Sequence, residues 1–138
     1  MSGREFIAYL TSLGFNVFPD PDHMPDVPES QLPALFVFGT GGFGSDPDLP
    51  IQYPSFQVIV KGKSYKTDYM QMELTEALAK SLIDALDQKT GYVIDSNKVY
   101  YSRSQSSNPI PIGLDIHDRP TYSTNFNFKI QPALKGAY

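Results

Sequence analysis

The sequence predicts an α+β fold: a single domain over residues 1–138 with a mixed or antiparallel β-sheet, packed by one long central helix and a short N-terminal helix. Three observations indicate this fold. Residues 121–131 alternate between polar and apolar types, as a half-buried strand does. Residues 67–89 repeat apolar types every three to four positions, as an amphipathic helix does. The elements follow the order helix, strands, long helix, strands, without an internal repeat or a linker.

A capping box predicts the start of the first helix. Ser2 and Glu5 stand three positions apart, so each side chain can accept a hydrogen bond from the backbone N–H of the other. Gly14 supplies a C-terminal stop, because glycine readily takes the left-handed conformation that ends helices. The apolar residues between these two signals recur at helical spacing: Phe6, Ile7, Leu10 and Leu13.

Short strands and two long loops are expected next. Residues 15–18 predict a short strand, and residues 32–38 and 56–61 predict the two strands of a hairpin. Residues 19–31 begin with a proline-rich run that forbids regular structure. Residues 39–52 are rich in glycine and also predict a loop.

The amphipathic pattern over residues 67–89, closed by Gly91, predicts the main helix. At 1.5 Å per residue it would be roughly 30 Å long, enough to cross a small sheet and cover one face. The stripe expected to face the sheet is Met70, Leu74, Ala77, Leu78, Ser81, Leu82 and Ala85. The solvated face is expected to hold Glu73, Glu76, Lys80, Asp84 and Asp87.

The last third of the chain predicts more strands. Residues 92–94 and 98–103 are strand-like, and Pro109 and Pro111 interrupt the chain before the last strand. One face of that strand is expected to be buried: Tyr122, Thr124, Phe126, Phe128 and Ile130. The other is polar and carries little charge: Thr121, Ser123, Asn125, Asn127, Lys129 and Gln131. Such a surface suits hydrogen bonding between subunits and suits solvent equally, and the pattern does not choose between them.

Charge and composition exclude several classes of function. Eleven Lys and Arg against fifteen Asp and Glu give a formal net charge of −4, which argues against a nucleic-acid binder that neutralises phosphates. The chain has no cysteine, which excludes disulfides and thiolate metal sites. It shows neither a signal peptide nor an apolar run of about 20 residues, so we expect a protein made in the cytoplasm that spans no membrane.

Residues 39–44 match the G-x-G-x-x-G pattern of dinucleotide-binding turns. Such a turn needs a helix N-terminus directly after it to hold the pyrophosphate. The following residues 45–50, SDPDLP, cannot start a helix of useful length. We therefore interpret this segment as a hairpin tip or an assembly loop.

Two clusters of polar residues could carry chemistry. One matches no established metal loop and is interpreted as ordinary loop residues: Asp20, Asp22, His23 and Asp26. In the other, His117 lies between Asp115 and Asp118, where turn hydrogen bonds and ion pairs are expected, including a salt bridge between Asp115 and Arg119. No G-x-S-x-G nucleophile elbow occurs. The sequence therefore predicts no catalytic residue, no metal site and no cofactor, and the protein is not expected to be an enzyme.

Aromatic residues are abundant, with nine Tyr and nine Phe. Aromatic side chains anchor interfaces, because they bury a large area at little entropic cost. They also fill the core of a small sheet protein that lacks tryptophan, and both interpretations stay open. The aromatics nearest the polar loops are Phe43, Tyr53, Tyr65 and Tyr138.

Two segments carry a family pattern. In residues 53–69, a strand is followed by a basic residue and a glycine, then by an aromatic residue that enters a long helix running to Leu86. In residues 109–128, a proline-rich bend precedes Gly113, Asp115 and Arg119, and a final strand carries S-x-N-F. These segments resemble the tail terminator, minor tail and neck proteins of long-tailed bacteriophages. The first 50 residues match only in the order of their elements.

The resemblance implies a structural virion protein that forms a hexameric ring, caps the tail tube, ends its polymerisation and docks the tail to the neck. The implied partners are further copies of the chain, the major tail tube protein and a neck or head-completion protein. Genomic DNA would pass through the lumen without specific binding. The implied location is the head-proximal end of the virion tail, with assembly in the host cytoplasm.

Carried onto this sequence, the resemblance assigns the contacts to loops 19–31 and 39–52 and to the bend before the last strand. The predicted subunit or tube interface residues are Phe43, Tyr53, Asp115, Arg119, Asn125, Asn127 and Gln131. The substitution Arg119→Glu is expected to impair assembly with little loss of the fold. Two other functions stay open: a head-completion or connector protein, and a monomeric ligand-binding or catalytic domain that uses a cleft near the two loops.

Overall fold

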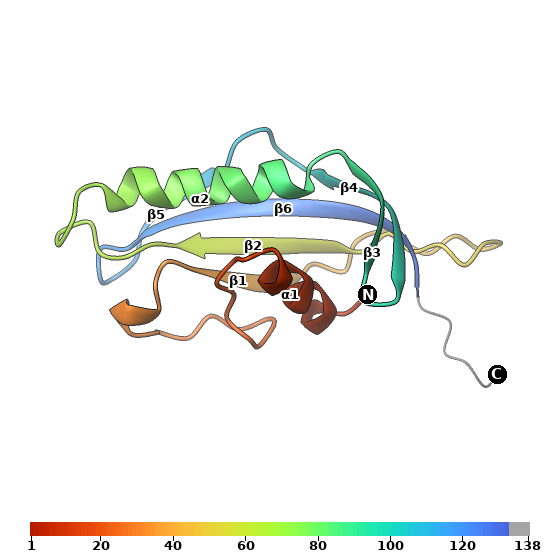
Figure 1. The fold of residues 1–138 in the computed structure, drawn as a ribbon, viewed down its shortest axis with the longest axis horizontal. Helices are drawn as coiled ribbons and strands as arrows, with labels where there is room; N and C mark the ends of the chain where they lie inside the picture. Colours follow the sequence, from red (N-terminus) through yellow and green to blue (C-terminus); the bar gives the residue numbers. More distant parts are fainter. Residues whose placement is uncertain (133–138) are drawn as a thin grey trace.

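The computed structural model describes residues 1–132. It has a six-stranded antiparallel sheet and two α-helices (Figure 1). The predicted α+β fold is confirmed. In chain order the elements are α1 (Gly3–Ser12), the 3-10 helix η1 (Glu29–Gln31), β1 (Ala34–Gly39), β2 (Ser55–Lys61), α2 (Gln71–Leu86), β3 (Lys89–Ile94), β4 (Asn97–Ser104), β5 (Ile110–Leu114) and β6 (Pro120–Gln131).

The long strand β6 is the centre of the sheet, whose order is β1-β2-β6-β4-β3. β2 pairs with one edge of β6, while β5 and β4 share the other edge, β5 along the first residues of β6 and β4 along the last. Phe126, Phe128 and Ile130 on one face of β6 are at most 1% exposed, so the predicted alternation is confirmed from Thr124 onward. At the start of the strand it is not, because Thr121 and Ser123 of the polar face are buried and Tyr122 is only partly buried. The hairpin of β1 and β2 is confirmed as well.

The main core lies between one face of the sheet and both helices (Figure 1). Three phenylalanine rings meet at its centre. The ring centroid of Phe6 in α1 lies 4.9 Å from that of Phe56 in β2 and 5.2 Å from that of Phe128 in β6. Such pairs add about 0.5–1.5 kcal/mol each beyond the burial of area. These contacts tie the first helix to the last strand.

Helix α1 starts where its capping box predicts. The Ser2 hydroxyl accepts the backbone N–H of Glu5 at 3.2 Å, and the Glu5 carboxylate accepts the backbone N–H of Ser2 at 2.8 Å. A second carboxylate oxygen of Glu5 accepts a hydrogen bond from the side chain of Asn97, at the hairpin between β3 and β4. The cap therefore fixes both the start of the helix and the position of the helix against the sheet.

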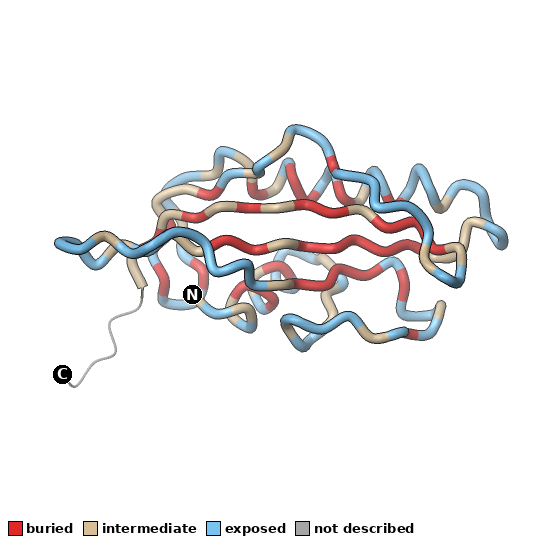
Figure 2. The backbone as a smooth tube through the Cα atoms, turned by 180° about the vertical axis from the view of Figure 1, so that it is seen from behind, coloured by how far each residue is buried: buried red, intermediate tan, exposed pale blue. Residues whose placement is uncertain are grey.

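The other face of the sheet is covered only in part. The segment before β1 folds over β1 and β2 and forms a second, smaller cluster: Val27, Leu32, Ala34, Phe36 and Ile59, with Phe18 and Phe38. Within residues 1–132 no helix crosses this face over β6 and β4, as the view from behind shows (Figure 2). We call this uncovered part of β2, β4 and β6 the open sheet face.

The main helix differs from its prediction in length and in the side that it buries. It runs from Gln71 to Leu86, not over residues 67–89, because turns occupy residues 65–67 and 69–70 and Asp87 is extended. The buried residues are Thr75, Ala79, Leu82, Ile83 and Leu86. Of the predicted stripe only Leu82 is buried, Leu78 and Ala85 are partly buried, and Met70, Leu74, Ala77 and Ser81 are exposed. The predicted buried stripe is therefore largely wrong.

The buried side of α2 meets the chain closely just after β2. Thr75 is 1% exposed and lies against Gly62, where a Cβ atom would collide with the threonine hydroxyl. A helix packed this closely needs small residues at the contact, so Thr75 and Ala79 face the sheet in place of Leu74 and Met70.

Two smaller predictions are also wrong. Residues 15–18 form no strand but a single parallel bridge between Val17 and Leu35. Residues 110–114, expected to be broken by proline, form β5. Pro111 is tolerated there because β5 lies outside the main strand order and its pairing with β6 has an irregularity at that point.

Candidate assembly surfaces

The bend between β5 and β6 is organised by Asp115. One carboxylate oxygen accepts the backbone N–H groups of His117 and Arg119, at 2.8 and 3.0 Å. The other lies 3.0 Å from the Lys61 ammonium. Burial alone would raise the pKa of Asp115, but these backbone N–H groups and Lys61 outweigh it and hold the pKa below its ordinary value. The predicted salt bridge from Asp115 to the Arg119 guanidinium is wrong, since Asp115 contacts the backbone of Arg119 and not its guanidinium.

The Arg119 guanidinium binds instead to residues of loop 19–31. Its Nε donates to Glu29 at 2.8 Å and an Nη donates to Asp26 at 2.9 Å. The residue is only 6% exposed. Asp26 also meets His117, 3.1 Å away, and the backbone N–H of Ser64 bonds to Glu29. Loop 19–31 is therefore held against the sheet by charged pairs at this end and is part of the folded body.

The polar residues Asp20, Asp22, His23 and Asp26 are close in the sequence, but each contacts a different part of the structure. Asp20 pairs with Arg4 at 3.4 Å, Asp22 accepts the backbone N–H of Gly39 at 2.7 Å, and Asp26 binds Arg119. The His23 ring packs edge-on against Phe18. Within residues 1–132 no group of three or more His, Cys, Asp or Glu gathers as metal ligands would.

Residues 40–54 form an arm that projects beyond the sheet (Figure 1). Its base continues the hairpin, because Thr40 bonds to Ser55 and Phe43 to Tyr53 through the backbone. Phe43 and Tyr53, both predicted interface residues, are thus brought side by side, and the Phe43 side chain is 70% exposed. No helix follows residues 39–44, so the arrangement that a dinucleotide needs is not formed.

A glycine fixes the base of this arm. Gly42 has a φ of +72° and lies so close to the backbone of Tyr53 and Pro54 that a Cβ atom there would collide with it. Only glycine combines that conformation with that approach. The tip beyond it is exposed and carries a second apolar side chain, Leu49, at 55% exposure.

The open sheet face holds the predicted polar residues and ties them together. The side chain of Asn127 accepts hydrogen bonds from Ser55 at 2.6 Å and from Gln105 at 3.0 Å. Gln131 accepts one from the Tyr100 hydroxyl at 3.0 Å. Asn125 donates to Ser123 at 3.3 Å. These side chains are half-buried and held in place before any partner arrives, which lowers the entropic cost of binding one.

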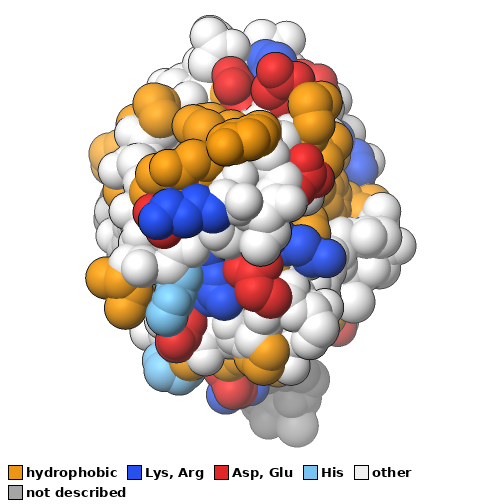
Figure 3. All heavy atoms as spheres, turned by 90° about the vertical axis from the view of Figure 1, so that its left-hand side faces the viewer, with side chains coloured by type: hydrophobic (Ala, Val, Ile, Leu, Met, Phe, Trp, Pro, Cys, Tyr) orange, Lys and Arg blue, Asp and Glu red, His pale blue; other side chains and the backbone are white. Residues whose placement is uncertain are grey.

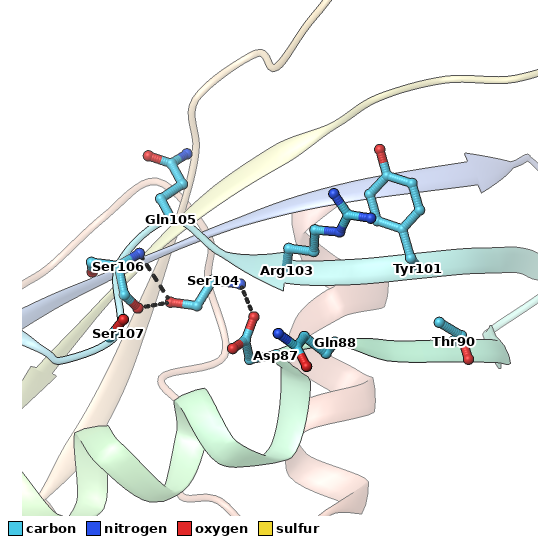
Figure 4. A pocket seen from close by; sticks show the side chains of 9 residues that line it. All are labelled: Asp87, Gln88, Thr90, Tyr101, Arg103, Ser104, Gln105, Ser106 and Ser107. Atoms are coloured by element: carbon cyan, nitrogen blue, oxygen red, sulfur yellow. Dashed lines mark hydrogen bonds between the residues drawn. The ribbon is translucent and has the colours of Figure 1, made fainter.

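A hollow of about 460 Å³ opens where α2 ends beside β4 (Figure 4). Asp87 accepts the backbone N–H of Ser104 at 2.9 Å, and the Ser104 hydroxyl donates to the carbonyl of Ser106. Arg103 lies over the Tyr101 ring, 4.4 Å from its centroid. The other residues that line this hollow are Gln88, Thr90, Gln105 and Ser107.

Sequence reasoning missed one surface, which begins at the start of α2. Figure 3 shows hydrophobic side chains gathered on that end of the molecule. Among the exposed residues there are Tyr69, Met70, Met72 and Leu74, at 44–80% exposure. The sequence contained a signal for this surface. Helix α2 carries one apolar stripe that includes Leu82 and a second that includes Leu74, and only one of the two can face the sheet.

Residues 9–132 match the family model described as bacteriophage tail terminator protein. The chain belongs to this family. The match spans β2, α2, the bend and β6, which lie in or follow the two segments that carry the resemblance. This tail terminator is therefore a structural protein of the phage virion and part of its tail, where it contacts other tail or neck proteins. No curated protein and no solved structure matches the chain. Among the residues that the structure describes, no helix is long and apolar enough to cross a membrane.

Proposed function

We propose that six copies of this tail terminator form a closed ring that caps the tail tube, ends its polymerisation and docks the tail to the neck. The family match over residues 9–132 carries the proposal. The ring, its six copies and its place at the head-proximal end follow from what the resemblance implies. The partners would be the major tail tube protein and a neck or head-completion protein, with assembly in the host cytoplasm.

The shape of the molecule supports a head-to-tail ring. A ring built from one repeated contact needs two different, complementary surfaces on each copy. The two helices cover one face of the sheet, and the other face is open over β4 and β6 (Figures 1 and 2). The arm projects at one end of the molecule, and hydrophobic side chains gather at the other (Figures 1 and 3).

The interface residues fit this proposal in different ways. Phe43 and Tyr53 would act from the arm, and Asn125, Asn127 and Gln131 from the open sheet face. Asp115 and Arg119 would act indirectly, since Asp115 shapes the bend and the Arg119 guanidinium is occupied within its own copy. Genomic DNA would pass through the lumen without specific binding.

The proposal is tested by adding the purified protein to polymerising tail tube protein of the same phage. A terminator shortens the tubes as its concentration rises and leaves capped ends that do not resume growth. End-on views of those caps should show six copies. Tubes of unchanged length with bare ends at a large excess of the protein would contradict the proposal.

A further inference from the structure

The open sheet face carries three cations without a carboxylate partner in the described chain. They are Lys98 and Arg103 on β4 and Lys129 on β6, and none of the ion pairs within residues 1–132 includes them. The three strands of this face, β2, β4 and β6, contain no Asp or Glu. In a chain with a net charge of −4, this face is therefore locally basic.

Tyrosine rings hold these cations in place. The Lys98 and Lys129 ammonium groups lie 5.5 and 5.7 Å from the centroid of the Tyr100 ring, and Arg103 lies 4.4 Å from that of Tyr101. A cation over a ring keeps its charge and its outward hydrogen-bond donors. The three groups can still bind carboxylates from outside.

The outer face of α2 has the opposite charge. Glu73, Glu76 and Asp84 are exposed there, with one cation, Lys80, which lies 3.9 Å from Asp84 and donates to the carbonyl of Ser107. Beside the acidic residues runs an exposed row of apolar or small side chains: Met70, Leu74, Ala77 and Ser81. An apolar row next to charges, with a small residue at its centre, is suited to close packing against another surface.

The two surfaces lie on opposite faces of one sheet, so a single copy cannot bring them together (Figures 1 and 2). The rows of charged residues on the two surfaces have similar lengths. The acidic row from Glu73 to Asp84 is roughly 16 Å long at 1.5 Å per residue of helix. The cations from Lys98 to Arg103 span roughly 16 Å at 3.3 Å per residue of strand.

We propose that, between neighbouring copies, the outer face of α2 of one copy packs on the open sheet face of the next, with Glu73, Glu76 and Asp84 facing Lys98, Arg103 and Lys129. This inference rests on the proposed ring and adds the contact that builds it. The contact explains why the acidic outer face of α2 and the basic open sheet face, both on the same chain, are complementary in charge. A phosphate backbone would satisfy the cations but would leave the row through Leu74 and Ala77 uncovered.

Cysteine cross-linking tests the contact directly, because the chain has no cysteine of its own. Ala77→Cys on α2 is combined in turn with Gln57→Cys, Tyr101→Cys or Asn125→Cys on the open sheet face. The two positions of each pair lie on opposite sides of the sheet and cannot form a disulfide within one copy. The matched control pairs Ala77→Cys with Ser12→Cys, which is exposed on the helix side.

Tailed virions that carry each pair are oxidised and run on a non-reducing gel. The proposed contact gives a ladder of multiples of the single chain for at least one sheet pair, lost on reduction, and no ladder for the control. Intact virions without a ladder from any of the three sheet pairs would overturn the proposal, as would an equal ladder from the control.

Charge reversal supplies a second test that does not depend on disulfide geometry. Phage lacking the gene is complemented with Glu73→Lys/Glu76→Lys, with Lys98→Glu/Lys129→Glu, or with a chain carrying all four changes. Each single-face variant should lower the titre roughly tenfold or more, because like charges then face each other, and the combined variant should recover most of it. Circular dichroism of each purified variant checks the fold.

The outcomes separate this contact from the proposed function. If both single-face variants restore normal titre and tail length, the contact is wrong while termination stands. If only the sheet-face variant fails, and its tails have normal length but do not deliver DNA, the cations serve nucleic acid and the contact is likewise overturned. If the unaltered chain itself does not change tail length, the proposed function fails first.

Discussion

The Nε of Arg119 donates a 2.8 Å hydrogen bond to Glu29, which lies 90 positions earlier in the chain. With the contact to Asp26, this bond holds the first loop across the strands that it covers. Arg119 is buried, while the side chains of Asp26 and Glu29 are 67% and 43% exposed. Arg119, directly before β6, is thus one of the residues that fix the loop to the fold.

Arg119→Met should destabilise the fold by about 2 kcal/mol, because two charge-assisted hydrogen bonds are lost while the partly exposed carboxylates regain water. Urea unfolding at pH 7 measures this. The control Arg4→Met removes an ion pair whose side chains are 71% and 56% exposed, and it should change stability by less than about 0.5 kcal/mol. An equal decrease in the free energy of unfolding in both variants would contradict the role of Arg119 in holding loop 19–31.

Arg119→Glu should cost more stability than Arg119→Met. The substitution places a third carboxylate beside Asp26 and Glu29, where like charges repel. This reverses the expectation from sequence that Arg119→Glu leaves the fold nearly intact. Thermal melting of the two variants decides the matter: a melting temperature for the glutamate variant equal to that of the unaltered chain would restore the earlier expectation.

Asp115 should make the fold sensitive to acid. Its pKa in the folded chain lies below the ordinary value of 3.8, so its contribution is present above that value and is lost as the pH falls through the lower, folded pKa. Urea midpoints measured from pH 6 down to pH 3 should fall most steeply below about pH 4. Asp115→Asn should flatten part of that fall, and a curve parallel to that of the unaltered chain would count against the assignment.

Gly62→Ala should destabilise the contact between α2 and the sheet. The added Cβ would collide with the Thr75 hydroxyl, which is buried and bonded to the Gln71 carbonyl. Overpacking of this kind typically costs about 1–3 kcal/mol. Gly44→Ala is the matched control, because open space surrounds that position. Denaturant titration should show a lower free energy of unfolding for Gly62→Ala and an unchanged one for Gly44→Ala.

The arm should matter for assembly and not for folding. Phe43→Ser with Leu49→Ser changes two residues that are 70% and 55% exposed, so the free energy of unfolding should stay within about 0.5 kcal/mol of that of the unaltered chain. Complementation of phage lacking the gene should nevertheless fail. Full titre from the double variant would remove the arm tip from the interface.

The local rules of sequence were sufficient for much of the fold. The capping box at Ser2 and Glu5 placed the first helix, and two-residue alternation identified both faces of β6, because each pattern reports directly on its own backbone. The loop at residues 39–52 was also expected as an extended contact element, and the structure shows it as the arm of residues 40–54 (Figure 1).

Other features depend on contacts between distant residues and could not be read from local patterns. The pairing of Arg119 with Asp26 and Glu29 needs the first loop folded over the sheet. The side that α2 buries was decided by Thr75 against Gly62, where small size counted for more than hydrophobicity. Leu74 and Met70, assigned to the core, are exposed, and that error marks the surface proposed to meet the next copy.

The most direct test of the central claim is electron microscopy of a lysate from the parent phage with this gene knocked out. We expect filled heads that are separate from overlong, unterminated tails, and tails of normal length when the gene is supplied in trans. Tails of normal length joined to heads in the knockout would contradict it.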